Sequence, residues 1–209
     1  MTKYQKGFSD IKQFTDYKVV GEDIDYAVIV DNERKEIILQ FKESDSREDW
    51  KHNLTFLPWL LKLDNKYIVT TRGYACAYKS AESKPLDDFC KAIASFPDYK
   101  KVIRGWSFGS AMSKIAVRHY YYRTKNKVDE VYTYGDVKCM FNPFVHISIK
   151  KYAKLSHNFV CINDFVTWQV PFYWRMSTSR VGGKFSFKKI LNSAHNHCYY
   201  EEYDYSKYE

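Results

Sequence analysis

The sequence has little glycine or proline and no long apolar run. Its 209 residues include 8 Gly and 5 Pro, which excludes collagen-like and Pro/Gly-rich low-complexity chains. No segment approaches the ~18 consecutive apolar residues of a membrane helix, and the first residues lack the apolar core of a secretory signal. We therefore expect a cytoplasmic protein, and the richness in Lys, Tyr and Asn indicates a bacterial or viral origin.

Cysteine is also scarce, and its positions are widely spread. The five cysteines are odd in number, and no two of them have C-x-x-C or zinc-site spacing. We expect reduced thiols that mostly pack in the interior of an intracellular protein. The sequence therefore predicts no disulfide framework, no metal and no cofactor.

What the sequence does contain is many aromatic residues and an excess of positive charge. Aromatic residues make up 18%, apolar residues in total 45%, and the formal net charge is +8. These are proportions of a folded globular chain, and the length fits one domain. The basic residues form no long run and no nucleic-acid motif is present. We expect a solvated basic surface that suits an anionic membrane face, and no nucleic-acid partner; the oligomeric state stays open.

Strands and helices alternate along most of the chain. A short helix is predicted within residues 1–23, and apolar spacing of three and four predicts helices at 83–96 and 110–122. Apolar runs predict strands at 25–31, 36–41, 68–71, 99–104, 128–134 and 158–162. The acidic and aromatic tail, 199–209, is predicted to be partly disordered. The alternation predicts one α/β domain over 1–209, with a mixed, largely parallel sheet flanked by helices.

The pattern most typical of chemistry is Gly105-Trp106-Ser107-Phe108-Gly109, which matches G-x-S-x-G. In such an elbow the serine lies on a strained turn between a strand and a helix, and small flanking residues let the chain turn without collision. The N-terminal amides and positive dipole end of the following helix would face a developing oxyanion. The motif predicts that Ser107 is a nucleophile, and the alternative is a glycine-bounded turn with an inert serine.

Three further stretches accompany this elbow in a characteristic order. Before it, a strand leads to Phe41-Lys42-Glu43-Ser44 and the pair Asp49-Trp50. After it come VYTYGDV at 131–137 and VCINDFVTWQVP at 160–171. Together the four stretches resemble the class 3 lipases, the fungal-type triacylglycerol lipases of the α/β-hydrolase superfamily. They are similar to that family's F-R-G-T loop with a D-W pair, its G-x-S-x-G elbow, its strand ending T-F-G-x-P, and its N-x-x-D-x-V segment. The resemblance implies an α/β-hydrolase-like fold.

The resemblance also implies a catalytic triad. Ser107 would be the nucleophile and Asp164 the acid. His197 would be the base, because the family favours an aromatic residue three positions after this histidine and Tyr200 stands there. The order Ser, Asp, His along the chain is that of the superfamily. The triad would form and hydrolyse an acyl-enzyme.

The oxyanion hole implied by the resemblance uses the backbone N–H groups of Phe108 and Ser44, with the hydroxyl of Ser44 as a further donor. The chain departs from the family at Lys42-Glu43, where Arg-Gly is usual, and at Val137, where proline is usual. Because glycine permits backbone angles that glutamate resists, Glu43 would alter the oxyanion loop.

Other residues compete for these roles. His195 is an alternative to His197 as the base, and Asp136 is an alternative acid because it also follows a predicted strand. His119 lies twelve residues after Ser107 and is predicted to occupy a helix face rather than the site.

We therefore expect a serine hydrolase that cleaves carboxylic esters, as a lipase, esterase or phospholipase, with a lipid or small ester as substrate. The aromatic residues between Trp168 and Phe187 would suit an acyl pocket or a lid. An alternative is a catalytically idle hydrolase fold used as a binding module. A nucleic-acid-binding protein that uses the charge and the aromatic residues is a weaker alternative. The acyl chain, the head group and the choice between hydrolysis and acyl transfer stay open.

Overall fold

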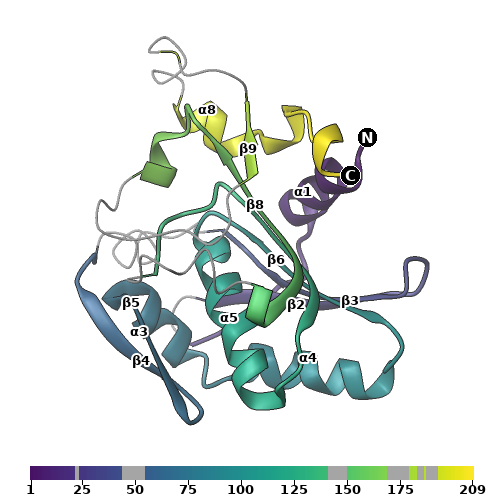
Figure 1. Ribbon diagram of the computed structural model, residues 1–209, viewed down its shortest axis with the longest axis vertical. Helices are drawn as coiled ribbons and strands as arrows, with labels where there is room; N and C mark the ends of the chain where they lie inside the picture. The colour runs from purple at the N-terminus through teal and green to yellow at the C-terminus, as the bar shows by residue number, and fades with distance from the viewer. Residues whose placement is uncertain (22–23, 44–54, 141–149, 169–178, 183–185, 187–192) are drawn as a thin grey trace.

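A mixed sheet of seven strands crosses the computed structural model, which describes residues 1–21, 24–43, 55–140, 150–168, 179–182, 186 and 193–209 (Figure 1). In spatial order the strands are β1 (Lys18–Val20), β2 (Ile24–Asp31), β3 (Glu36–Phe41), β6 (Lys100–Trp106), β7 (Val128–Tyr134), β8 (Ala153–Cys161) and β9 (Ser179–Val181). The first three are antiparallel, and β3 to β9 run parallel in this order. Helices flank the sheet, so the protein has the mixed, mostly parallel α/β fold that the sequence predicts.

The register of the parallel strands brings their carboxyl ends to one edge. Phe41 of β3 pairs with Gly105 of β6, and Trp106 of β6 pairs with Tyr134 of β7. Tyr134 in turn pairs with Phe159 of β8. Segments that leave these strands therefore begin side by side, which is where α/β folds place their ligands.

Both faces of the sheet are covered, because successive side chains of a strand point to opposite faces. Ile37 and Leu39 pack with one apolar cluster and Ile38 with the other. On the first face lie α3 (Arg72–Ser80), α4 (Lys84–Ser95) and α5 (Phe108–Thr124). The predicted helices at 83–96 and 110–122 are thus confirmed, and the second begins directly after Ser107.

The second face is covered by the two ends of the chain. Figure 1 shows the yellow C-terminal segment beside the purple helix α1 (Lys3–Gln13). That segment holds α8 (Ser193–Cys198) and two 3-10 turns, Tyr200–Glu202 and Ser206–Tyr208. Tyr200 and Tyr205 are fully buried, and Gln5 Nε2 donates to the carbonyl of Tyr203 at 3.1 Å. The prediction of a partly disordered tail is therefore wrong, because its aromatic side chains complete this apolar cluster.

A separate hairpin was only half predicted. Its strands are β4 (Pro58–Leu63) and β5 (Lys66–Thr71), of which the sequence predicts the second. Trp59 and Leu60 of β4 are exposed and only Leu61 and Leu63 are buried, so apolar residues mark both faces of this strand and its pattern is not that of a core strand. Within the described residues, no helix is long and apolar enough to cross a membrane.

Candidate active site at the carboxyl edge of the sheet

Ser107 lies on a strained turn between β6 and α5. Its backbone angles are φ 53° and ψ −117°, an uncommon conformation for a residue other than glycine. The N–H of Ser107 donates to the carbonyl of Tyr134 at 3.0 Å, which ties the turn to the end of β7. The flanking glycines are required by close approach. A Cβ on Gly105 would lie 2.2 Å from the carbonyl oxygen of Gly109, and one on Gly109 would lie 2.5 Å from that of Phe41.

His197 of α8 lies between Ser107 and Asp164. Its Nε2 is 2.8 Å from Ser107 Oγ, and its Nδ1 is 2.7 Å from Asp164 Oδ2. Ser107 and His197 are each 8% exposed, whereas Asp164 is fully buried. The structure therefore brings together the three residues that the resemblance implied, although they are up to 90 positions apart in the chain. The alternative base, His195, instead binds Glu202 at 3.2 Å with half of its side chain exposed.

Asp164 follows β8 and precedes a 3-10 turn, Phe165–Trp168. Its Oδ1 accepts from the N–H of Val166 at 3.0 Å, and its Oδ2 also accepts from the hydroxyl of Tyr200 at 2.9 Å. Burial, and then the charge of Asp164, raise the pKa of the Tyr200 phenol well above its usual range. The phenol therefore stays protonated and remains a donor. These bonds hold the carboxylate as an acceptor toward His197.

Tyr200 has a second anchor. Its oxygen accepts from the backbone N–H of Cys161 at 3.0 Å, at the last residue of β8. In the sequence, Tyr200 is only an aromatic marker for the histidine, and its contact with Asp164 is not predicted. The signal available was the aromatic residue that the resemblance places three positions after the histidine.

Two further residues hold His197, one at its backbone and one at its imidazole. Trp106 Nε1 donates to the carbonyl of His197 at 3.0 Å. Gly135 has φ 51°, and a Cβ there would lie 2.7 Å from His197 Cε1. Both contacts were missed from the sequence, although each residue stands beside a predicted strand end. A glycine directly after a strand is the signal that a close approach was possible.

The alternative acid, Asp136, is engaged elsewhere. It is fully buried, and its Oδ1 lies 2.8 Å from Lys114 Nζ of α5. His119 is also placed away from Ser107, on the buried face of α5, with its Nδ1 3.1 Å from the hydroxyl of Tyr78.

Of the two implied oxyanion donors, one lies in the described residues. Phe108 is the first residue of α5, so its N–H belongs to the N-terminal amides that have no acceptor inside a helix. Ser44, like the Asp49-Trp50 pair, lies outside the described residues. Glu43 is half-buried, and after burial its charge is the main cause that raises the pKa of the Cys198 thiol. The negative charge of Glu43 therefore acts on the residue that follows His197.

The arrangement is a hydrogen-bonded chain from a serine hydroxyl through an imidazole to a buried carboxylate. Such a chain lets the imidazole accept the hydroxyl proton while the carboxylate stabilises the resulting positive charge. The family model of lipase (class 3) matches residues 38–173. The chain belongs to the class 3 lipase family.

Solved structures of fungal lipases share this fold. The triacylglyceride lipase of Rhizomucor miehei is 18% identical, with a TM-score of 0.65 over 79% of this chain and 65% of that one. A triacylglycerol lipase whose catalytic centre is a serine protease triad is 19% identical, with a TM-score of 0.62 over 79% and 66%. The lipase of Rhizopus microsporus var. chinensis is 17% identical, with a TM-score of 0.63 over 78% and 59%. This chain thus spans less than two thirds of each. A search of curated proteins finds no match.

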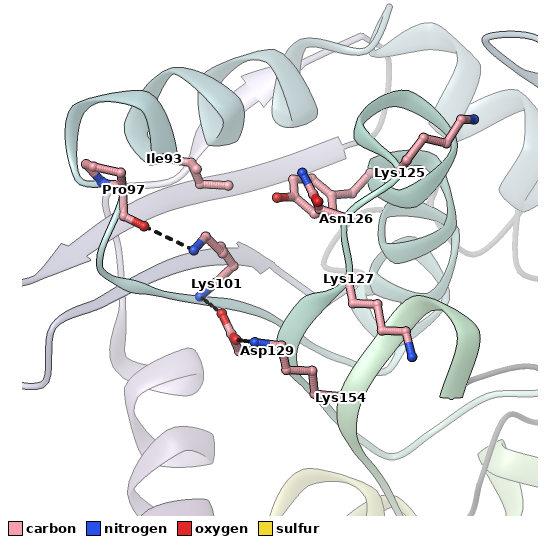
Figure 2. Close-up of a pocket in the computed structure, with 9 residues that line it drawn as sticks. Ile93, Pro97, Lys101, Lys125, Asn126, Lys127, Asp129 and Lys154 are labelled. Atoms are coloured by element: carbon pink, nitrogen blue, oxygen red, sulfur yellow. Dashed lines mark hydrogen bonds and ion pairs between the residues drawn. The ribbon is translucent and has the colours of Figure 1, made fainter.

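A basic pocket lies at the opposite edge of the sheet, where β6 and β7 begin (Figure 2). Its volume is about 510 Å³. Four lysines line it, and each ammonium group already binds an oxygen of this chain: Lys101 that of Pro97, Lys125 that of Tyr122, Lys127 that of Lys150, and Lys154 the carboxylate of Asp129. The pocket therefore offers a basic surface whose lysines already bind oxygens of this chain, and we place the candidate active site at Ser107 instead.

Proposed function

We propose that this protein hydrolyses carboxylic esters of lipids through Ser107, His197 and Asp164. The observation that carries the proposal is the pair of distances at His197, 2.8 Å to Ser107 Oγ and 2.7 Å to Asp164 Oδ2. Family membership supports the reaction class, and the strained turn at Ser107 supports its role as the nucleophile.

In the proposed acylation step, His197 Nε2 takes the proton of Ser107 while Oγ attacks the ester carbonyl carbon. The carbonyl oxygen becomes an oxyanion, and the N–H of Phe108 at the start of α5 donates to it, with Ser44 as the proposed second donor. Collapse breaks the bond to the alcohol, which leaves with the proton from His197. Water then attacks the acyl-enzyme by the same proton path, and the acid product leaves.

Asp164 is proposed to orient the imidazole and to stabilise its charged form. The carboxylate accepts from Tyr200 and from the N–H of Val166, two neutral donors that hold it in place. A buried carboxylate in this geometry favours a proton on His197 Nδ1, which leaves Nε2 free to accept the proton of Ser107.

A lipid is the proposed substrate class, because exposed aromatic side chains follow directly after the acid. Phe165 is 59% exposed and Trp168 is 47% exposed, on the turn that begins one residue after Asp164. Aromatic side chains of this kind suit the boundary between water and a lipid phase. Most of the predicted acyl pocket or lid, between Trp168 and Phe187, lies outside the described residues.

The first experiment is labelling with a fluorophosphonate probe, mapped by peptide mass spectrometry. Wild type is expected to carry the label on Ser107, and Ser107→Ala is expected to carry none. Ser95→Ala is the matched control, because Ser95 lies at the exposed end of α4. Unlabelled wild type, Ser107→Ala and Ser95→Ala are then assayed on short-chain esters, triacylglycerol emulsions, and anionic and zwitterionic phospholipid vesicles. Folded wild type that neither labels nor hydrolyses any ester would instead support the idle binding module.

A further inference from the structure

A fully buried ion pair lies next to the triad and is not used by the proposed reaction. Lys114 Nζ of α5 is 2.8 Å from Asp136 Oδ1, and neither side chain is exposed to solvent. Lys114 also donates to the backbone carbonyl of Val137. Removing two charges from water is costly, and their mutual attraction frequently fails to offset that cost. The pair is therefore better explained by the geometry that it fixes than by stability alone.

The ion pair holds the segment at the end of β7, residues 133–137. On one side, the N–H of Val137 donates to Ser110 Oγ at 3.2 Å, and Ser110 belongs to α5 like Lys114. On the other side, the N–H of Asp136 donates to the carbonyl of Phe159 in β8 at 3.3 Å. The hydroxyl of Thr133 lies 3.0 Å from Asp136 Oδ1. The segment is thus held between α5 and β8, with the ion pair at its centre.

The same segment contacts both reacting residues of the proposed triad. The carbonyl of Tyr134 accepts from the N–H of Ser107, and Gly135 lies against the imidazole so closely that a Cβ would be 3.0 Å from His197 Nδ1. Gly135 is the residue before Asp136. A shift of Asp136 therefore moves the surface on which the imidazole rests.

We propose that Lys114 and Asp136 are positioning residues, which hold the end of β7 against His197 and so set the approach of its Nε2 to Ser107. The proposal rests on the proposed hydrolase function of this site. Neither residue touches a substrate. They act through the backbone of Gly135, because Gly135 precedes Asp136 in the chain and lies against His197.

The test uses a variant that removes both charges, Lys114→Met with Asp136→Leu. A single substitution would leave one buried charge without a partner and so report mainly on folding. The double variant is expected to unfold cooperatively, with kcat reduced about tenfold or more and KM within about twofold, because misplacement of a reacting group mainly affects the chemical step. Arg123→Met is the matched control, because Arg123 of α5 pairs with Asp64 at the surface. It is expected to keep wild-type kcat.

A second variant acts on the same segment without changing a charge. Ser110→Ala removes the acceptor of the Val137 N–H and is expected to lower kcat in the same direction. If the double variant does not fold, the kcat of Ser110→Ala tests the positioning role. A wild-type kcat in whichever of these variants folds would overturn the proposal.

An NMR readout separates this proposal from the proposed function. The proton between His197 Nδ1 and Asp164 gives a signal that depends on the length of that hydrogen bond, whether or not the protein turns over an ester. We expect this signal to shift or broaden in the double variant and to stay unchanged in Arg123→Met. Wild type that does not hydrolyse esters would defeat the proposed function alone, whereas an unchanged signal in the double variant would defeat the positioning role.

Discussion

The hydroxyl of Tyr200 donates to the same carboxylate oxygen of Asp164 that binds His197, at 2.9 Å and 2.7 Å respectively. Because Tyr200 lies three residues after His197, one short segment supplies both the imidazole and the clamp on its carboxylate partner. The local C-terminal fold and the geometry of the proposed triad are therefore coupled.

Tyr200→Phe tests this coupling. The change removes one hydrogen bond to Asp164 and leaves the N–H of Cys161 without its acceptor, so we expect kcat/KM for ester hydrolysis to fall about tenfold, which corresponds to about 1.4 kcal/mol. Tyr208→Phe is the matched control, since its hydroxyl donates to the carbonyl of Arg180 near the surface. Equal kcat/KM in the two variants would show that Tyr200 serves packing alone.

Gly135→Ala is expected to displace the imidazole. The φ of 51° is strained for alanine, and the new Cβ would collide with His197 Cε1. We expect a loss of about 1–2 kcal/mol in the free energy of unfolding from the backbone conformation, and a fall in kcat of about 100-fold from misplacement of the base. Denaturant unfolding and ester hydrolysis measure the two effects separately. A variant with normal kcat would mean that His197 tolerates a shift of this loop.

The buried His119 predicts that stability depends on pH. Burial outweighs the attraction of Asp64 and lowers the pKa of His119 below 6.5 in the folded state. At a pH between the pKa of His119 in the folded state and its pKa in the unfolded state, the unfolded chain binds more protons than the folded one. The free energy of unfolding is therefore highest above about pH 6.5, and it is lost as pH falls through the folded-state pKa. The slope approaches about 1.4 kcal/mol per pH unit for one proton. Urea unfolding from pH 7.5 to 5 should show it.

His119→Gln is expected to reduce this slope. His157→Gln should act in the same direction, because burial also lowers the pKa of His157. Identical slopes in wild type and both variants would contradict the assignment of the pH dependence to these buried histidines.

Tyr205→Ala tests whether the C-terminal tail is part of the core. Tyr205 is fully buried and its ring centroid lies 4.6 Å from that of Phe159 in β8. We expect a loss of about 3–5 kcal/mol in the free energy of unfolding, as for other large aromatic side chains truncated in a core. Tyr199→Ala is the control, because Tyr199 is 40% exposed, and its loss should be below about 1 kcal/mol. Similar small losses would indicate a tail that adds little to the core.

The sequence by itself determined the features that depend on local pattern. Apolar runs and helical spacing predicted six sheet or hairpin strands and the helices α4 and α5, because burial periodicity is a property of neighbouring residues. The glycines at 105 and 109 located the strained turn at Ser107, because only small residues permit that approach. The resemblance then named His197 and Asp164 from short motifs.

Only the tertiary structure decided how distant segments meet. It placed α8 at the carboxyl ends of β6 and β8, so that His197, rather than His195, contacts Ser107. In the same way Asp164 contacts His197, whereas Asp136 contacts Lys114. It also folded the aromatic tail onto α1, which a local pattern of acidic and aromatic residues did not indicate. The physical reason is the same in each case. Hydrogen bonds and apolar contacts between residues far apart in the chain fixed these positions, and such contacts leave no periodic signal in the sequence.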